Sequence, residues 1–458
     1  MKNWKSIMAG LVGATLAMGV QAQESFVHQQ SAVNGYVWPT DKEVLQKLDQ
    51  WQDLKFGVLF HWGLYSVPGI CESWGLCSED VEWLGHNVPY EEYKKWYWGF
   101  KDKFNPVDFN PEQWAEVMKD AGMKYMIFTT KHHDGFCMFD SKYSDFSVAA
   151  TQFKNHPRMN LAYHVFDAFR KENFMIGCYY SKPDWHSEWY WSPFLATPTR
   201  RENYKRKLHP EWWKNYQQFT QNQLNELMSD YGKMDILWLD GGWVTGDEIG
   251  LDDVLKKARV NNPGLISVDR TIRGKNENYQ TPEGTIPAEQ LNIPWESCIP
   301  LAGNWGWVKG AKFKSSQKVL NTLIEICAKG GCYVLGVGPT PEGVIQPEVT
   351  EILHRIGEWL RANGKAIYST RTTPNYHAGN TWFTADKDGE TLYAIYALPE
   401  GESLPETIEW TGNLPKGSMR LVSNGRRVSY KCEGDKVIVK LPKGMKDEAV
   451  ALKFRLKK

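Results

Sequence analysis

The stretch Phe56-Gly-Val-Leu-Phe-His61 is apolar over the length of one strand and ends on a histidine. A short apolar run of this kind is typical of a strand that is buried on both faces, as in a parallel sheet. Similar runs recur at residues 124–130, 174–180, 234–240, 265–269 and 333–337. The pattern therefore predicts a series of parallel strands, several of which end on polar residues.

Helical patterns separate these predicted strands. Asn110-Pro111 supplies an N-cap and a first-turn proline for a helix that ends before Gly122, and a longer helix is expected over about 212–231. Strands that alternate with helices favour a parallel (β/α)8-like barrel with its helices outside. An open doubly wound sheet is the alternative, but no Gly-x-Gly-x-x-Gly turn follows the first strand.

The pattern changes near residue 370. Short alternating segments such as Thr391-Leu-Tyr-Ala-Ile-Tyr396 are separated by turn signals such as Asp388-Gly389 and Asn424-Gly425. We therefore predict an antiparallel β-sandwich domain over residues 369–458, after a β/α barrel over residues 23–368.

The first residues have the features of a secretory signal peptide. Lys2 and Lys5 precede an uncharged apolar stretch over residues 7–20, and Val20-Gln21-Ala22 offers small residues before a cleavage point. We expect residues 1–22 to be removed near Ala22 and the protein to be exported, either to the periplasm or out of the cell. Since no later segment has eighteen consecutive apolar residues, we expect no membrane insertion.

Composition narrows the class of ligand. The 458 residues include 54 Lys and Arg against 54 Asp and Glu, so the chain lacks the basic excess of a nucleic-acid binder. Its 22 tryptophans exceed its 13 methionines. Core packing accounts for most tryptophans, but the indole ring also stacks well on the apolar faces of sugars.

Polar residues gather where the predicted strands end. In a β/α barrel the chemistry lies at the carboxyl ends of the strands. Histidine, carboxylate and aromatic residues recur there, namely His61, His132, His133, Tyr180, Asp240, Asp269 and Arg270.

Two kinds of chemistry use such residues. A zinc hydrolase binds its metal through several histidines and an aspartate, but its usual pair of histidines one residue apart on the first strand is absent. A glycosidase needs two carboxylates, hydrogen-bonding groups for hydroxyls and aromatic walls. Asp240, flanked by Trp238 and Trp243, fits the glycosidase better, and we expect neither a metal ion nor a cofactor.

Three segments resemble glycoside hydrolase family 29, the α-L-fucosidases. They are Lys55-Phe-Gly-Val-Leu-Phe-His-Trp-Gly-Leu-Tyr-Ser-Val-Pro68, Thr129-Thr-Lys-His-His-Asp-Gly-Phe136 and Leu237-Trp-Leu-Asp-Gly241. The likeness extends in order over about residues 40–370. It implies an irregular β/α barrel, a carboxyl-terminal β domain and a retaining mechanism.

The resemblance also implies roles for individual residues. Asp240 matches the nucleophile, and Glu283 in Gln280-Thr-Pro-Glu-Gly284 best matches the general acid/base, with Glu296 as the alternative. The sugar contacts carried over by motif are His61, Glu82, Trp83, His132, His133, Tyr180, Trp238, Arg270 and Trp305.

The expected function is that of an exo-acting α-L-fucosidase, which removes terminal α-L-fucosyl residues from oligosaccharides or glycoconjugates by double displacement. Leu59 and Asp80 depart from the family pattern near carbon six of the sugar. An α-L-galactosidase acting on an L-galactosylated glycan is therefore an alternative, because an apolar pocket rejects an added hydroxyl only weakly. A non-catalytic sugar-binding protein is a less favoured one.

Overall fold

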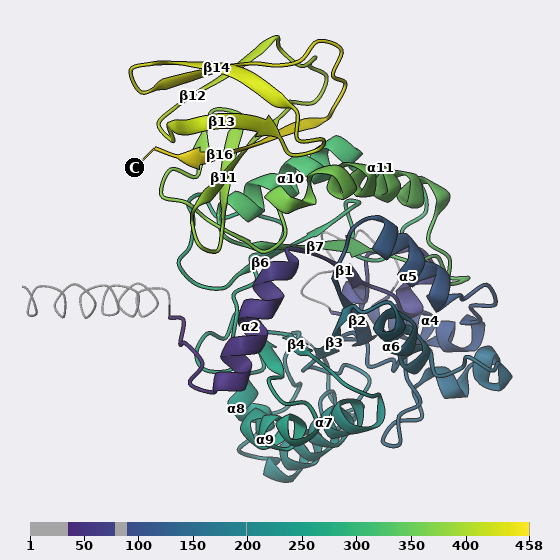
Figure 1. The fold of residues 1–458 in the computed structure, drawn as a ribbon. Coiled ribbons are helices and arrows are strands. Elements are labelled where there is room, and N and C mark those ends of the chain that lie inside the picture. The colour runs from purple at the N-terminus through teal and green to yellow at the C-terminus, as the bar shows by residue number, and fades with distance from the viewer. Residues whose placement is uncertain (1–34, 78–88, 198, 458) are drawn as a thin grey trace, which may run out of the picture.

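The structure is a computed structural model that describes residues 35–77, 89–197 and 199–457. The predicted signal peptide, Asp80 and the Glu82-Trp83 pair lie outside the described residues. Two sheets organise the rest: a parallel sheet surrounded by helices, and an antiparallel sheet at the carboxyl end (Figure 1).

Seven parallel strands form the first sheet in the order β5-β4-β3-β2-β1-β7-β6. They are β1 (Phe56–Phe60), β2 (Tyr125–Lys131), β3 (Met175–Ser181), β4 (Ile236–Asp240), β5 (Ile266–Asp269), β6 (Glu296–Pro300) and β7 (Cys332–Val337). The six runs recognised in the sequence match β1 to β5 and β7 to within two residues. The predicted parallel, barrel-like arrangement is therefore confirmed.

An irregular segment lies between β5 and β6, where a regular barrel has another strand. Asn278 N donates to Ser267 O of β5 over 2.8 Å, and Glu296 N at the start of β6 donates to Gln280 O over 2.8 Å. A parallel bridge joins Glu283 to Cys298. The segment thus contacts both edge strands of the sheet and carries Glu283 with it.

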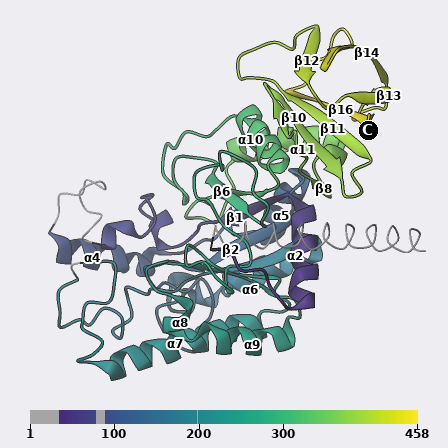
Figure 2. The same cartoon turned by 90° about the vertical axis from the view of Figure 1, so that its left-hand side faces the viewer.

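Helices surround the parallel sheet, with α7 and α9 along one side of it (Figure 2). The predicted start of the helix at 111 is confirmed, because the Asn110 side chain accepts a hydrogen bond from Gln113 N. The helices are α2 (Lys42–Leu54), α4 (Tyr90–Trp98), α5 (Pro111–Asp120), α6 (Leu161–Lys171), α7 (Pro210–Asp230), α8 (Gly246–Ile249), α9 (Leu251–Asn261), α10 (Ser316–Ala328) and α11 (Pro347–Asn363). Short 3₁₀ turns are η1 (Leu64–Ser66), η2 (Trp74–Leu76), η4 (Gly99–Lys103), η5 (Val148–Ala150), η6 (Gln152–Asn155) and η7 (Gly364–Ala366).

The carboxyl-terminal sheet is antiparallel and has its own core, which includes Phe383, Trp410 and Phe454. Helices α10 and α11 lie between it and the parallel sheet (Figure 1), and the Trp359 indole of α11 donates to Ala449 O over 2.8 Å. Its strands are β8 (Thr370–Arg371), β9 (His377–Ala378), β10 (Thr381–Asp386), β11 (Thr391–Ala397), β12 (Thr407–Thr411), β13 (Pro415–Leu421), β14 (Arg427–Glu433), β15 (Lys436–Lys440) and β16 (Ala449–Leu456).

Gly57 in β1 provides a test of the packing inside the barrel. A Cβ atom at this position would lie 2.6 Å from the Tyr125 ring on the neighbouring strand, in a fully buried layer. We expect Gly57→Ala to lower the free energy of unfolding by about 1–3 kcal/mol, because a filled interior cannot accept a methyl group without displacement. Urea unfolding measures the change.

Gly99 supplies the matched control. It has right-handed helical dihedral angles, and a Cβ atom there would meet nothing within 4 Å. Gly99→Ala should leave the free energy of unfolding unchanged or raise it by a few tenths of a kcal/mol. Equal destabilisation by the two substitutions would contradict the packing argument.

Candidate active site

A cavity of about 310 Å³ lies at the carboxyl ends of the parallel strands. It brings together eight of the residues expected at the site: His61, His132, His133, Trp238, Asp240, Arg270, Glu283 and Trp305. Because parallel strands end at the same edge of a sheet, residues more than 200 positions apart in the chain come to share one cavity.

His132 and His133 both line this cavity although they are adjacent in the chain. Strand β2 ends at Lys131, and Gly135 N then donates to His132 O over 3.1 Å, so the backbone turns. The two imidazole rings consequently lie 4.3 Å apart instead of on opposite faces of a strand.

Asp240 at the end of β4 is held by several donors. Arg270 Nη1 lies 2.9 Å from Oδ1, Gly241 N donates to Oδ1 over 2.8 Å, and the Tyr179 hydroxyl donates to Oδ2 over 2.7 Å. Burial acts to raise the pKa of this carboxyl, but the charge of Arg270, together with the hydrogen bonds from Tyr179 and Gly241, outweighs it and holds the pKa well below its usual range. Asp240 is therefore an anion at neutral pH.

The three histidines of the cavity are neutral at the same pH. Burial lowers the pKa of His132 to about 4 and places those of His61 and His133 well below the usual value. His132 Nδ1 lies 2.6 Å from Ser73 Oγ, whereas His61 Nδ1 and both ring nitrogens of His133 have no hydrogen-bond partner in the described part of the chain. Neutral imidazoles with free nitrogens can donate to or accept from hydroxyl groups.

Glu283 faces the same guanidinium as Asp240. Arg270 Nη2 lies 2.5 Å from Glu283 Oε2, and the Trp305 indole donates to Oε1 over 3.0 Å. Its side chain is 48% exposed, against 17% for Asp240. One guanidinium thus bridges a largely buried carboxylate on a strand and a half-exposed one on the irregular segment.

Glu296, the alternative acid/base, occupies a different environment. It is fully buried, it does not line the cavity, and its oxygens accept from the Tyr125 hydroxyl at 2.7 Å and the Trp238 indole at 3.4 Å. Burial raises the pKa of Glu296 to about 8. The indole of Trp238 therefore has Glu296 on one side and belongs to the cavity wall on the other.

Comparison with known proteins agrees with this arrangement. The sequence profile of the alpha-L-fucosidase family matches residues 22–365. The chain belongs to this family. The tissue alpha-L-fucosidase of Bos taurus is 30% identical over 380 residues, which are 78% of this chain and 76% of the bovine protein.

Solved fucosidase structures share the fold. Alpha-L-fucosidase isoenzyme 1 from Paenibacillus thiaminolyticus superimposes with a TM-score of 0.76 at 28% identity, covering 91% of this chain and 100% of that one. The Thermotoga maritima alpha-fucosidase in complex with fucose gives a TM-score of 0.73 at 27% identity, with coverage of 91% and 100%.

The structure corrects one predicted contact of this fucosidase-family chain. Tyr180 does not line the cavity; its hydroxyl donates to Gln223 of α7 over 2.8 Å and accepts from Lys131 Nζ over 2.8 Å. Successive side chains of a strand point to opposite faces, so it is Tyr179 that turns inward and reaches Asp240.

Glu72 and Trp74 also line the cavity, and neither was singled out from the sequence. Glu72 is 2% exposed and its Oε1 accepts from Gly306 N over 2.7 Å, while the Trp74 ring lies 5.0 Å from that of His133. The available signal was their position just after the opening family motif, in Glu72-Ser-Trp74.

Metal ligation at the site can be assessed from its geometry. Three potential metal ligands lie close together, because one ligand atom from each of His132, His133 and Asp240 is within 4.8 Å of the other two. A metal ion could bridge these atoms. Arg270 already pairs with Asp240, so a cation there would compete with a guanidinium. The neighbouring indoles and carboxylate fit a hydroxyl-rich ligand better.

Glu296 makes the stability of this family member depend on pH. Its folded-state pKa of about 8 lies above the ordinary value of 4.5, so the folded chain binds one more proton than the unfolded chain between these values. The free energy of unfolding should therefore fall as pH rises through that window. We expect Glu296→Gln to remove a slope approaching ~1.4 kcal/mol per pH unit.

Urea titrations at pH 5 to 8 measure this slope. Glu358→Gln, at a side chain that is 63% exposed, controls for the loss of one negative charge. If the free energy of unfolding depends on pH with the same slope in wild type and Glu296→Gln, Glu296 is ionised in the folded protein and the prediction is wrong.

Proposed function

We propose that this protein is an exo-acting, retaining α-L-fucosidase that hydrolyses terminal α-L-fucosyl residues of oligosaccharides or glycoconjugates. The observation that carries the proposal is the pair of carboxylates, Asp240 and Glu283, that contact one guanidinium inside a cavity of neutral imidazoles and indoles. Support comes from the relatives that are named alpha-L-fucosidases and from the Thermotoga enzyme, which was solved with fucose.

In the first step, a carboxylate oxygen of Asp240 attacks the anomeric carbon. The bond from that carbon to the leaving oxygen breaks while Glu283 gives its proton to this oxygen. In the second step, Glu283 takes a proton from water, the water oxygen attacks the anomeric carbon, and the bond to Asp240 breaks. Two inversions restore the original configuration, which is the retaining outcome.

The environments of the two carboxyl groups support these roles. Asp240 must stay ionised to act as a nucleophile, and the low pKa imposed mainly by Arg270 meets that need. Retaining enzymes place the two carboxyl groups about 5–5.5 Å apart. Two carboxylates that bind one planar guanidinium are compatible with such a short separation.

The remaining cavity residues suit a 6-deoxy sugar. His61, His132 and His133 can form directional hydrogen bonds with ring hydroxyls, and Trp238 can pack against an apolar sugar face. Leu59 adds an aliphatic wall for a methyl group. L-Fucose carries a methyl group where L-galactose carries a hydroxymethyl group, so this wall gives the fucosidase a modest advantage over the α-L-galactosidase, since an apolar pocket rejects an added hydroxyl only weakly.

Export and domain division complete the proposal. We infer that residues 1–22 are a signal peptide and that the mature protein acts in the periplasm or outside the cell. In the described part of the chain, no helix has both the length and the apolar character needed to cross a bilayer. Residues 23–368 would form the catalytic barrel, and residues 369–458 a β-sandwich with a structural role.

Asp240→Asn tests the nucleophile. The amide cannot form the glycosyl ester, so we expect kcat on an aryl α-L-fucoside to fall at least ~10³-fold. Asp252→Asn, at an exposed carboxylate, is the matched control and should retain wild-type turnover. Wild-type protein should prefer the aryl α-L-fucoside over the aryl α-L-galactoside. Binding of L-fucose without any turnover would instead indicate a non-catalytic protein.

Glu283→Gln tests the acid/base. We expect kcat/KM for a fucoside with a poor leaving group to fall about 10²–10⁴-fold, with a much smaller loss for a dinitrophenyl leaving group that needs no proton. Azide, a nucleophile that needs no general base, should replace water in the second step, restore kcat of Glu283→Gln on the dinitrophenyl fucoside and yield fucosyl azide. Glu296→Gln is the comparison: if it shows this pattern and Glu283→Gln does not, Glu296 is the acid/base.

A further inference from the structure

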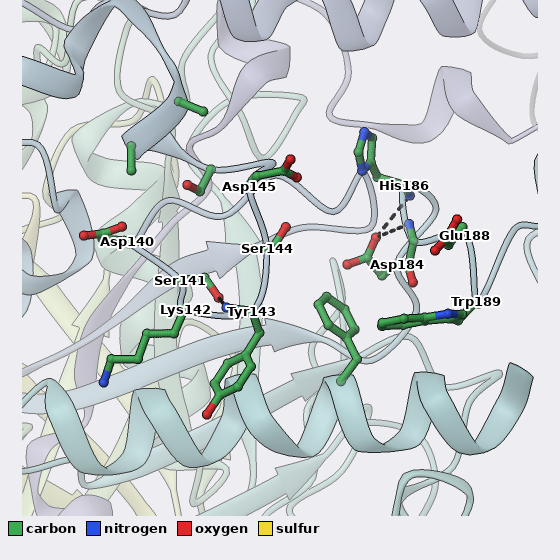
Figure 3. A pocket seen from close by; sticks show the side chains of 15 residues that line it. Asp140, Ser141, Lys142, Tyr143, Ser144, Asp145, Asp184, His186, Glu188 and Trp189 are labelled. Atoms are coloured by element: carbon green, nitrogen blue, oxygen red, sulfur yellow. Dashed lines mark hydrogen bonds between the residues drawn. The ribbon is translucent and has the colours of Figure 1, made fainter. Parts of the chain in front are cut away.

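A second cavity, of about 750 Å³, lies between residues 140–150 and 184–189, and Phe219 of α7 also lines it (Figure 3). It is separate from the active-site cavity, because none of the described residues lines both. Asp184 and His186 line the second cavity, whereas the Trp185 ring between them lies 5.2 Å from the ring of His133. The mechanism above uses none of the residues that line this second cavity.

Aromatic side chains flank the second cavity. Tyr143, which is 46% exposed, stands on one side of it and Trp189 on the other (Figure 3). Trp189 is half-buried, with its ring packed edge-to-face against Phe219 at 5.9 Å. These rings give the cavity flat apolar surfaces that remain partly accessible.

Exposed carboxylates also line the second cavity. In the described part of the chain, the carboxylates of Asp140, Asp145 and Glu188 form no ion pair and accept no hydrogen bond, although all three are exposed at the cavity. The nearby cation Lys142 pairs with Asp230 at 2.5 Å. The cavity therefore offers hydrogen-bond acceptors whose capacity the protein itself does not use.

We propose that this second cavity is a carbohydrate-binding site that takes a neutral pyranose unit of a glycan. An indole face covers the C–H face of such a ring, and carboxylates accept hydrogen bonds from adjacent hydroxyls. The volume falls within the usual range for small-ligand sites, about 300–1,000 Å³.

The spacing of the carboxylates favours a sugar over a metal ion. Within the described residues, the one group of His, Cys, Asp and Glu close enough to share an ion is His132, His133 and Asp240 in the other cavity. Acceptors that are spread over one cavity match hydroxyls distributed around a pyranose better than they match a single ion. The inference goes beyond the proposed function, because binding here requires no turnover.

The test uses lactose, a neutral disaccharide without fucose, and the intact protein. Calorimetric titration is performed with saturating L-fucose, so that the active site is occupied. We expect saturable binding of lactose, weakened at least about fivefold by Trp189→Ala because the stacking surface is lost. Trp96→Ala, at a 47% exposed tryptophan of α4 that does not line the cavity, should change the affinity less than twofold.

Glu188→Gln, with a thermal melt of each variant, is the second arm. It keeps the shape of the side chain but weakens the acceptor, and it should reduce lactose affinity while leaving the melting temperature and aryl fucoside turnover unchanged. Three results would overturn the proposal: no binding of lactose, binding of lactose only in the absence of fucose, or equal lactose affinity in wild type and Trp189→Ala. Binding of the polycation spermine by a protein that does not bind lactose would overturn it as well, because the carboxylates would then be recognised by charge. Because turnover of the aryl fucoside is measured separately, failure here leaves the fucosidase proposal standing.

Discussion

The contact of Arg270 with Asp240 is the interaction on which the site depends. A carboxylate in a largely buried position is costly unless a charge partner and hydrogen bonds stabilise it. Arg270 supplies that charge at 2.9 Å, and its guanidinium also lies 4.9 Å from the centre of the Trp238 ring. The neighbouring imidazoles are neutral and add no charge, so the ionised groups of the cavity are this pair, Glu283 and the other charged side chains of the lining, Glu72 and Arg200. A neutral sugar can enter without breaking the contact of Arg270 with Asp240.

Buried ion pairs behind the cavity fix the backbone that carries these groups. Lys182, just after β3, pairs with Asp269, which directly precedes Arg270. Lys131, just before the two histidines, pairs with Asp184 at 2.8 Å. Each pair joins the ends of different strands. Such pairs contribute little net stability, but removal of one partner would leave a buried charge, so they restrict the strand ends to one arrangement.

The sequence predicted the strands of the parallel sheet wherever their hydrophobic pattern was strong. The runs that became β1 to β5 and β7 are continuous and apolar, whereas β6 begins Glu296-Ser-Cys and lacks that signal. Tyr179 and Tyr180 could not be told apart, because a strand buried on both faces has no polar alternation to mark which side faces inward. Glu283 could be predicted as a site residue only through its motif, because it lies on a segment with neither strand nor helix periodicity.

The irregular segment gives the two carboxyl groups different freedom, and their proposed roles require that difference. A nucleophile must hold one position and one ionisation state. Asp240 meets both requirements, because it ends the five-residue strand β4 and accepts hydrogen bonds from several donors. An acid/base must lose and regain a proton in every cycle and must reach both the leaving group and water. Glu283 is half-exposed where a regular strand would have buried or fixed it. The departure from barrel regularity between β5 and β6 is therefore a feature that retaining hydrolysis can use.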